Sequence, residues 1–163
     1  IEPGDVAQVV LTVRSMQLQQ HGGQVAFAGG KQDAEDKNLI DTALRETHEE
    51  LGIPIQHIEV LGQMPFLPTV SAYNVAPVIG LLKPNTDIVP NTGEVAKVFA
   101  VPLAQLMQPQ RYVHYPVMRG NQAFQTVKFA HTEHIWGATA TILLALAEHY
   151  QAFVKDIRYG VGG

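Results

Sequence analysis

The sequence predicts one α/β domain in which strands and helices interleave without strict βαβ alternation. Two observations support this class. The chain has 163 residues, 46% of them hydrophobic and 16% charged, which suits a folded domain with a real core. Runs of β-branched residues also alternate with stretches of helical periodicity. We therefore expect residues 1–163 to form a single domain.

The elements follow from periodicity and from the turn residues between them. A helix is expected over Asn38–Leu51, because Gly52 and Pro54 end its periodic pattern. Two further helices are expected, at Leu103–Met107 and Ile135–Phe153. Strands are expected at Val6–Arg14, Gln24–Gly30, His57–Gln63, Asn74–Leu82, Val95–Val101 and Thr126–Ala130.

The composition excludes several classes of function. A net charge of −4 gives no general electrostatic reason to bind nucleic acid or an anionic membrane. The absence of cysteine excludes disulfides and thiolate chemistry, and it fits a reducing cytoplasm, where we expect the protein. No apolar run approaches the roughly 18 to 20 residues that span a bilayer. The chain starts IEPGDVAQVV, without Met and unlike a signal peptide, so we expect a truncated N-terminus.

The expected helix over 38–51 places its carboxylates on one face. At about 100° per residue, a core stripe separates from an acidic arc that holds Glu46, Glu49 and Glu50. Glu46 and Glu50 are one turn apart, and Arg45 is one turn before Glu49, where the two can pair. The core stripe consists of Ile40, Ala43, Leu44, Thr47 and Leu51.

This acidic arc lies near the C-terminal end of the helix, where the helix dipole disfavours negative charge. A solvated acidic face is the alternative explanation, but such faces usually mix charges of both signs. A bound hard cation with oxygen ligands, Mg²⁺ or Mn²⁺, explains the cluster better than Zn²⁺, which prefers histidine or thiolate. The helix therefore predicts a divalent metal site.

With the preceding loop, residues Gly29–Ile53 resemble the box motif of the Nudix family. The second half of the motif matches completely, and Thr47 departs mildly from the usual aliphatic residue. The spaced acidic position falls on Asp36, and its distance to Arg45 is one residue longer than usual. The matching residues are Arg45, Glu46, Glu49, Glu50, Gly52 and Ile53.

The extra residue and the stretch before the box resemble one branch of the family, the coenzyme A diphosphatases. Residues Val10–Gly30 match the second motif of that branch at the right spacing. Gln19 stands where the branch has arginine, and Ala28 where it has proline. Gln19 lacks the bidentate phosphate contact that arginine makes. The matching residues are Leu11, Thr12, Arg14, Ser15, Gly23, Phe27, Gly29 and Gly30.

The resemblance implies a Nudix-type α/β/α sandwich with a mixed β-sheet between helices. It also implies hydrolysis of the diphosphate of coenzyme A or an acyl-CoA, with Mg²⁺ or Mn²⁺ as cofactor. In such an enzyme the metal ligands would be Glu46, Glu49 and Glu50, completed by a backbone carbonyl at Gly29 or Gly30. The remaining site residues would be Arg45, Glu49, Glu94 and Arg14.

Three roles are expected of the last four residues. Arg45 would orient Glu49 through a salt bridge. The general base would be a box glutamate such as Glu49, or a later one, for which Glu94 is preferred. Arg14 would contact a substrate phosphate.

Two other interpretations remain open at this stage. The substrate could be another nucleoside diphosphate derivative, such as ADP-ribose or a dinucleotide, which would use the same glutamates. The protein could also bind a nucleotide without catalysis, although such proteins usually lose box carboxylates that this chain retains. We expect a small-molecule substrate, no nucleic-acid or membrane partner, and a monomer or homodimer.

Overall fold

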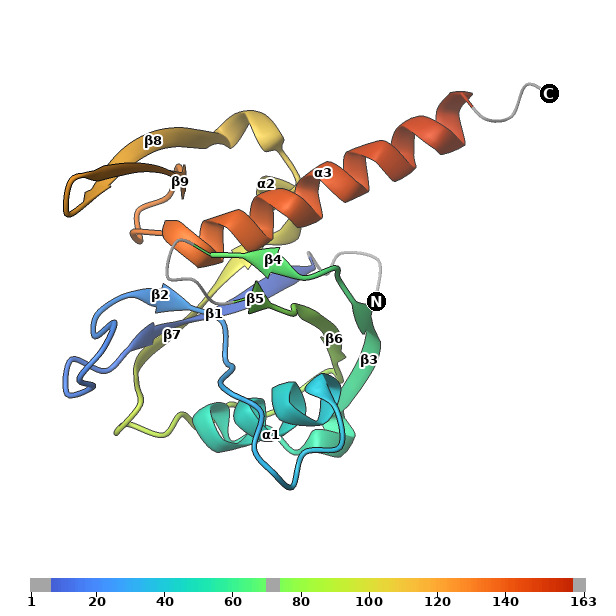
Figure 1. Cartoon of the computed structure of the whole chain (residues 1–163). Coiled ribbons are helices and arrows are strands. Elements are labelled where there is room, and N and C mark those ends of the chain that lie inside the picture. Colours follow the sequence, from blue (N-terminus) through green and yellow to red (C-terminus); the bar gives the residue numbers. More distant parts are fainter. Residues whose placement is uncertain (1–6, 70–73, 160–163) are drawn as a thin grey trace. The chain divides into compact units, whose positions relative to one another are not determined.

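The computed structural model describes residues 7–69 and 74–159, in two compact units (Figure 1). We call Leu11–Phe99 the central unit and Ile1–Val10 with Ala100–Gly163 the terminal unit. Strands β1 (Gln8–Arg14) and β7 (Val95–Pro102) contribute residues to both units. With β2 (Val25–Ala26) they form a three-stranded sheet in the order β2-β1-β7.

The central unit is organised around one helix and several short strands. Helix α1 spans Leu39–Leu51 and contacts strand β6 (Val78–Leu82), which pairs antiparallel with β3 (Ile58–Gln63). β1 and β2 are antiparallel, with Thr12 opposite Ala26. The smaller elements are the 3₁₀ helix η1 (Ile55–His57), β4 (Leu67–Pro68) and β5 (Asn74–Val75).

The terminal unit consists of a hairpin and a long helix. Strands β8 (Tyr112–Arg119) and β9 (Gln122–Phe129) pair antiparallel, and a two-residue turn joins them at Gly120, whose φ of 60° suits glycine there. Helix α3 (Gly137–Tyr159) packs against β9 (Figure 1). Helix α2 (Leu103–Leu106) and the 3₁₀ helix η2 (Pro109–Arg111) precede the hairpin.

A fully buried aromatic centre stabilises the terminal unit. Phe129 is completely buried, and its ring lies 4.9 Å from that of Tyr112, while the Arg111 guanidinium stands 4.8 Å above it. Burial also raises the pKa of the Tyr112 hydroxyl above its usual range. The Tyr112 hydroxyl donates to the Leu106 carbonyl at 2.9 Å, so the buried polar group is satisfied. This unit is therefore apolar at its centre.

The α/β fold of the Nudix type is confirmed, and most expected elements are present within a few residues. The expected strand at 74–82 is divided into β5 and β6, because Pro77 has no N–H to continue a ladder. Its carbonyl accepts from the Met64 N–H instead. Helix α3 begins at Gly137 and extends to Tyr159, later and longer than expected. Strand β8 was not expected at all, and Val6 lies outside the described residues.

Candidate active site

Helix α1 is closed by a polar cap at each end. The Asn38 side-chain oxygen accepts from the N–H groups of Ile40 and Asp41 at 2.9 and 3.0 Å. At the other end, Gly52 adopts the left-handed conformation with φ 65°, and its N–H donates to the His48 carbonyl at 2.9 Å. These two caps define where the helix begins and ends, and the glutamates lie in its last two turns.

Arg45 is the centre of a group of carboxylates that we call the Arg45 cluster, made by Arg45, Asp36, Glu46 and Glu49. Its Nε and Nη2 donate to the two oxygens of Asp36 at 3.0 and 2.9 Å, a bidentate pair. Its Nη1 donates to Glu46 at 2.9 Å and to Glu49 at 3.2 Å. Nη2 also donates to the Lys31 carbonyl at 3.1 Å. Arg45 therefore joins the loop before α1 to two of its glutamates.

Asp36 fills the spaced acidic position of the box, and its carboxylate is saturated with donors. Besides Arg45, it accepts from the Thr42 hydroxyl and from the Asp33 N–H, each at 2.9 Å. The hydrogen bond from Arg45 is the main reason that the pKa of Asp36 lies well below its usual range. The same contact raises the pKa of Arg45. The pair is thus ionised at any ordinary pH.

Glu50 has a different environment, which we call the Glu50 site, made by Glu50, Arg14, Gly29 and Glu94. Glu50 is only 3% exposed, and its nearest cation is Arg14, whose Nη1 lies 3.9 Å from Oε1. Burial raises the pKa of Glu50 to about 7; the Arg14 charge opposes that rise, the charges of Glu46 and Glu94 add to it, and a Gly29 backbone hydrogen bond opposes it. Glu50 is therefore the buried member of the acidic arc, and Gly29 and Arg14 lie against it.

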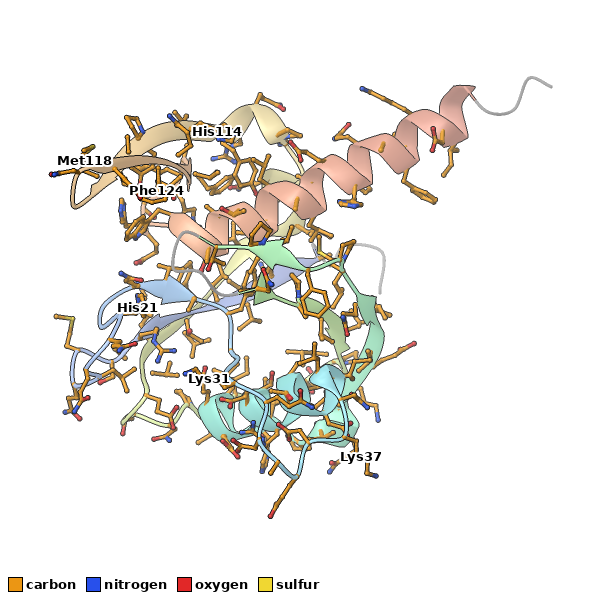
Figure 2. All side chains as sticks on the ribbon, in the orientation of Figure 1. His21, Lys31, Lys37, His114, Met118 and Phe124 are labelled. Carbon is orange, nitrogen blue, oxygen red and sulfur yellow. The ribbon has the colours of Figure 1, made fainter. Side chains whose placement is uncertain are left out.

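The glycine loop lies directly against the box carboxylates. A Cβ atom built on Gly30 would stand 2.7 Å from Oε2 of Glu46, inside van der Waals contact. With a side chain at position 30, either the Glu46 carboxylate or the loop would have to shift. The loop backbone at Gly29 and Gly30 thus borders both Glu46 and Glu50. In Figure 2, Lys31 and Lys37 mark the part of this loop that leads into α1.

The segment 89–94 brings Glu94 to the C-terminal end of α1, where Glu50 lies. The N–H groups of Val89 and Asn91 donate to the Leu51 and Glu50 carbonyls at 2.8 and 2.9 Å, so the segment is held on the last turn of the helix. The Glu94 carbonyl accepts from the Ser15 N–H at 2.7 Å, which ties it to the end of β1. Glu94 is thereby near enough to Glu50 to raise its pKa.

The donor set fits a hard divalent ion by its chemistry. All the candidate ligands are carboxylate or carbonyl oxygens, and the crowding of Glu50, Glu46 and Glu94 favours an added positive charge. Nevertheless, within residues 7–69 and 74–159 no three His, Asp or Glu side chains converge as a metal cluster. Arg45 instead donates from Nη1 to one oxygen each of Glu46 and Glu49. The ligand roles of the three glutamates stay a prediction.

The expected site residues all lie in the central unit. Glu50, Arg14, Gly29 and Glu94 come together, Gly30 touches Glu46, and Glu49 extends to Arg45 on the more exposed side. Sequence reasoning gave Asp36 only as a motif position and did not identify its bidentate contact with Arg45. It also missed Asn91, although Asn91-Thr92-Gly93 has the composition of an Asx turn.

A capped helix with clustered glutamates beneath a glycine loop is the arrangement that the box motif encodes. The sequence profile of the NUDIX domain matches residues 3–119. The chain belongs to the Nudix family and is a Nudix hydrolase, a class that acts on small molecules and generally uses divalent metal ions.

Relatives of known sequence support this assignment. The chain is 44% identical over 144 residues to an uncharacterized Nudix hydrolase, NudL, from Photorhabdus laumondii, covering 88% of this chain and 77% of the relative. The protein of the same name from Yersinia enterocolitica is 40% identical over 141 residues, covering 86% and 72%.

A solved structure supports the same fold. The crystal structure of RenU, a Nudix hydrolase from M. smegmatis, matches with a TM-score of 0.52 and 26% identity. That match covers 63% of this chain and 65% of RenU, slightly less than two thirds of its length. Among the helices of the described residues, none is long and apolar enough to cross a membrane.

Proposed function

We propose that this Nudix hydrolase cleaves the diphosphate of coenzyme A or an acyl-CoA, giving 3′,5′-ADP and 4′-phosphopantetheine. The observation that supports it most is the contact between two sequence motifs. Arg14 and Gly29 belong to Val10–Gly30, the stretch that resembles the coenzyme A branch, and both reach Glu50 of the box. The stretch that distinguishes the branch therefore borders the carboxylates expected to do the chemistry.

The ligands of the Mg²⁺ or Mn²⁺ ion would be Glu46 and Glu50, with Glu49 and a carbonyl of Gly29 or Gly30 completing the set. When bound, the ion would neutralise the diphosphate and lower the pKa of a water molecule. Arg45 would hold Glu46 and Glu49 in place through the contacts of the Arg45 cluster. Arg45 itself then has no donor left for the substrate, since each of its five N–H groups already makes a hydrogen bond.

Arg14 and Glu94 would act on the substrate and the water. Arg14 has a buried Nε without a hydrogen-bond partner among the described residues, so its charge is not saturated. It would bind a phosphate oxygen beside Glu50. A water oxygen would attack phosphorus, the anhydride P–O bond would break toward the leaving phosphate, and the water proton would pass to the Glu94 carboxylate. A box glutamate, Glu49, is the alternative base.

A second substrate class is favoured by one specific residue. Gln19, which stands where the coenzyme A branch has arginine, is exposed in the loop between β1 and β2. Without that arginine, one phosphate contact expected for coenzyme A is absent. ADP-ribose or a dinucleotide would use the same diphosphate chemistry and would need a different contact outside it.

A hydrolysis panel with Mg²⁺ or Mn²⁺ tests the proposal. Coenzyme A, an acyl-CoA, ADP-ribose, NADH and nucleoside triphosphates would be compared by kcat/KM, with products identified by mass spectrometry. We expect coenzyme A or its acyl ester to be the best substrate by at least about tenfold. Better cleavage of ADP-ribose would overturn the substrate assignment and leave the chemistry intact. We further propose that the protein is cytoplasmic and is a monomer or homodimer. Sedimentation analysis would check the oligomeric state.

A further inference from the structure

Asn91 connects the end of helix α1 to the start of the β7 region through its main chain. Its N–H donates to the Glu50 carbonyl at 2.9 Å. Its carbonyl accepts from the N–H groups of Glu94 and Val95 at 3.0 and 2.8 Å. One residue therefore joins the backbone of a box glutamate to the backbone of the external glutamate.

Both polar atoms of the Asn91 side chain also make hydrogen bonds. Its Oδ1 accepts from the Gly93 N–H at 3.1 Å, and its Nδ2 donates to Oε1 of Glu94 at 3.0 Å. A backbone N–H can only donate, so it requires the amide oxygen on its side, which leaves the NH₂ group for the carboxylate. The orientation of the amide is thus set by the turn itself.

The Glu94 carboxylate has few other constraints. Its main chain is held on both sides, by Asn91 and by the Ser15 N–H. For the side chain, the contact with Asn91 is the only hydrogen bond found among residues 7–69 and 74–159. Without it, the rotamer of a half-buried glutamate would be free to change.

We propose that Asn91 is a positioning residue for Glu94: its amide holds one carboxylate oxygen so that the other stays available to accept a proton. This inference rests on the proposed function, in which Glu94 serves as the base. The role fits the requirement that a catalytic group be held by neighbours whose own orientation is fixed. Asn91 needs no contact with substrate, so its effect should appear in kcat and not in KM.

A near-isosteric substitution separates this role from a structural one. Asn91→Asp retains the acceptor for the Gly93 N–H, replaces the donor with an acceptor, and places a negative charge beside Glu94. The matched control is Asn85→Asp, which makes the same change of charge in the same connection between β6 and β7. Asn85 is exposed and has φ 58°, a conformation that Asp tolerates as Asn does.

The experiment is a double-mutant cycle with Glu94→Gln, measured with the best substrate of the panel. We expect Asn91→Asp to lower kcat roughly tenfold, with KM changed less than about twofold. Asn85→Asp should have wild-type kinetics. In the Glu94→Gln background the Asn91→Asp effect should fall below about twofold, since the group that it positions is gone.

The outcomes distinguish the positioning role of Asn91 from the role of Glu94 as the base. An equal loss from Asn91→Asp in both backgrounds would overturn the positioning role. A normal Asn91→Asp enzyme beside an impaired Glu94→Gln enzyme would also overturn it, and would leave the base assignment standing. Full activity of Glu94→Gln would overturn both the positioning role of Asn91 and the assignment of Glu94 as the base. If Asn91→Asp does not fold, Asn91→Ser replaces it, since serine can still accept from Gly93 but cannot reach Glu94.

Discussion

The Arg45 cluster and the Glu50 site are neighbours on helix α1, and their carboxylates are paired with arginine in different ways. In the Arg45 cluster, one guanidinium makes hydrogen bonds of 2.9 to 3.2 Å to three carboxylates. In the Glu50 site, the buried carboxylate has its nearest cation at 3.9 Å, and two further glutamates lie close enough to raise its pKa. The guanidinium of the first group is hydrogen-bonded directly to its carboxylates, whereas the buried carboxylate of the second has its nearest cation only at 3.9 Å.

The difference indicates separate tasks for adjacent residues of the same motif. A saturated, bidentate network fixes the geometry of the loop and helix, and it gains little from further ligands. A buried carboxylate with a perturbed pKa and insufficient compensation is typical of a functional site. We therefore propose that the Arg45–Asp36 pair of the Arg45 cluster serves the scaffold, and that the Glu50 site takes part in the chemistry. Three substitutions test this division.

Glu50→Gln should have the largest effect on activity. The amide keeps the shape but loses the charge that would bind the metal, so kcat should fall on the order of a hundredfold to a thousandfold. Tm should stay equal or rise, because a neutral amide costs less to bury than a carboxylate. Steady-state kinetics and thermal unfolding followed by circular dichroism measure the two quantities.

The control for this substitution is Glu59→Gln, at an exposed position of β3. It should leave both kcat and Tm unchanged. Near-normal turnover by Glu50→Gln would show that the chemistry lies elsewhere, and the division between the two groups would fail. A large drop in Tm would instead indicate that Glu50 has the scaffold role assigned to the Arg45 cluster.

The part of the site that lies within one helix could be predicted from sequence. Asn38 and Gly52 are strong start and stop signals, and the i,i+4 spacing of Arg45 and Glu49 gives their contact at 3.2 Å. The burial of Glu50 could not be predicted in this way. It depends on which face of the helix meets the glycine loop and segment 89–94, and both of these contacts come from residues distant in sequence.

The hairpin of the terminal unit contains a second feature that could not be predicted from sequence, strand β8. Gly120-Asn121 between two strand-like runs is a hairpin signal, yet Pro116 within the first run argues against a strand. The structure places β8 in a two-stranded ribbon, where the missing N–H of Pro116 breaks no central ladder. Figure 2 shows Met118 and Phe124 near the tip of this ribbon. Local pattern alone could not distinguish an edge position from a central one.

Gly30→Ala should have an intermediate effect. The added methyl group would overlap the Glu46 carboxylate, so either the loop or the glutamate must move. A displacement of a catalytic ligand by about an ångström costs on the order of a hundredfold in rate, and we expect a loss of roughly ten- to a hundredfold in kcat. The affinity for Mn²⁺, measured by calorimetry, should weaken as well.

Gly62→Ala is the control for that change, because a Cβ there meets nothing within 4 Å and the residue lies in β3. Its kinetics and Mn²⁺ binding should match the wild type. If Gly30→Ala binds Mn²⁺ and turns over normally, the loop does not constrain Glu46, and the close approach seen in the structure has no functional role.

Asp36→Asn should affect stability more than catalysis, with a loss of only a few-fold in kcat and a drop of several degrees in Tm. The variant loses the charge that holds Arg45, while Glu46 and Glu49 remain on the helix. The matched control is Asp33→Asn, since Asp33 lies 3.6 Å from the same guanidinium but has a side chain that is 68% exposed. It should leave Tm almost unchanged because an exposed pair contributes little.

The pH dependence gives the sharper test of the Asp36 contact. The folded-state pKa of Asp36 is depressed, so its contribution is fully present above the unfolded value, roughly 3.9, and is lost as pH falls toward the lower folded value. The Tm difference between wild type and Asp36→Asn should therefore be constant from about pH 5 to 7 and should narrow below about pH 4. A difference that persists unchanged into strong acid would mean that the Asp36 charge is not what holds Arg45. The scaffold role would then belong to the shape of the loop and not to the saturated ion pair.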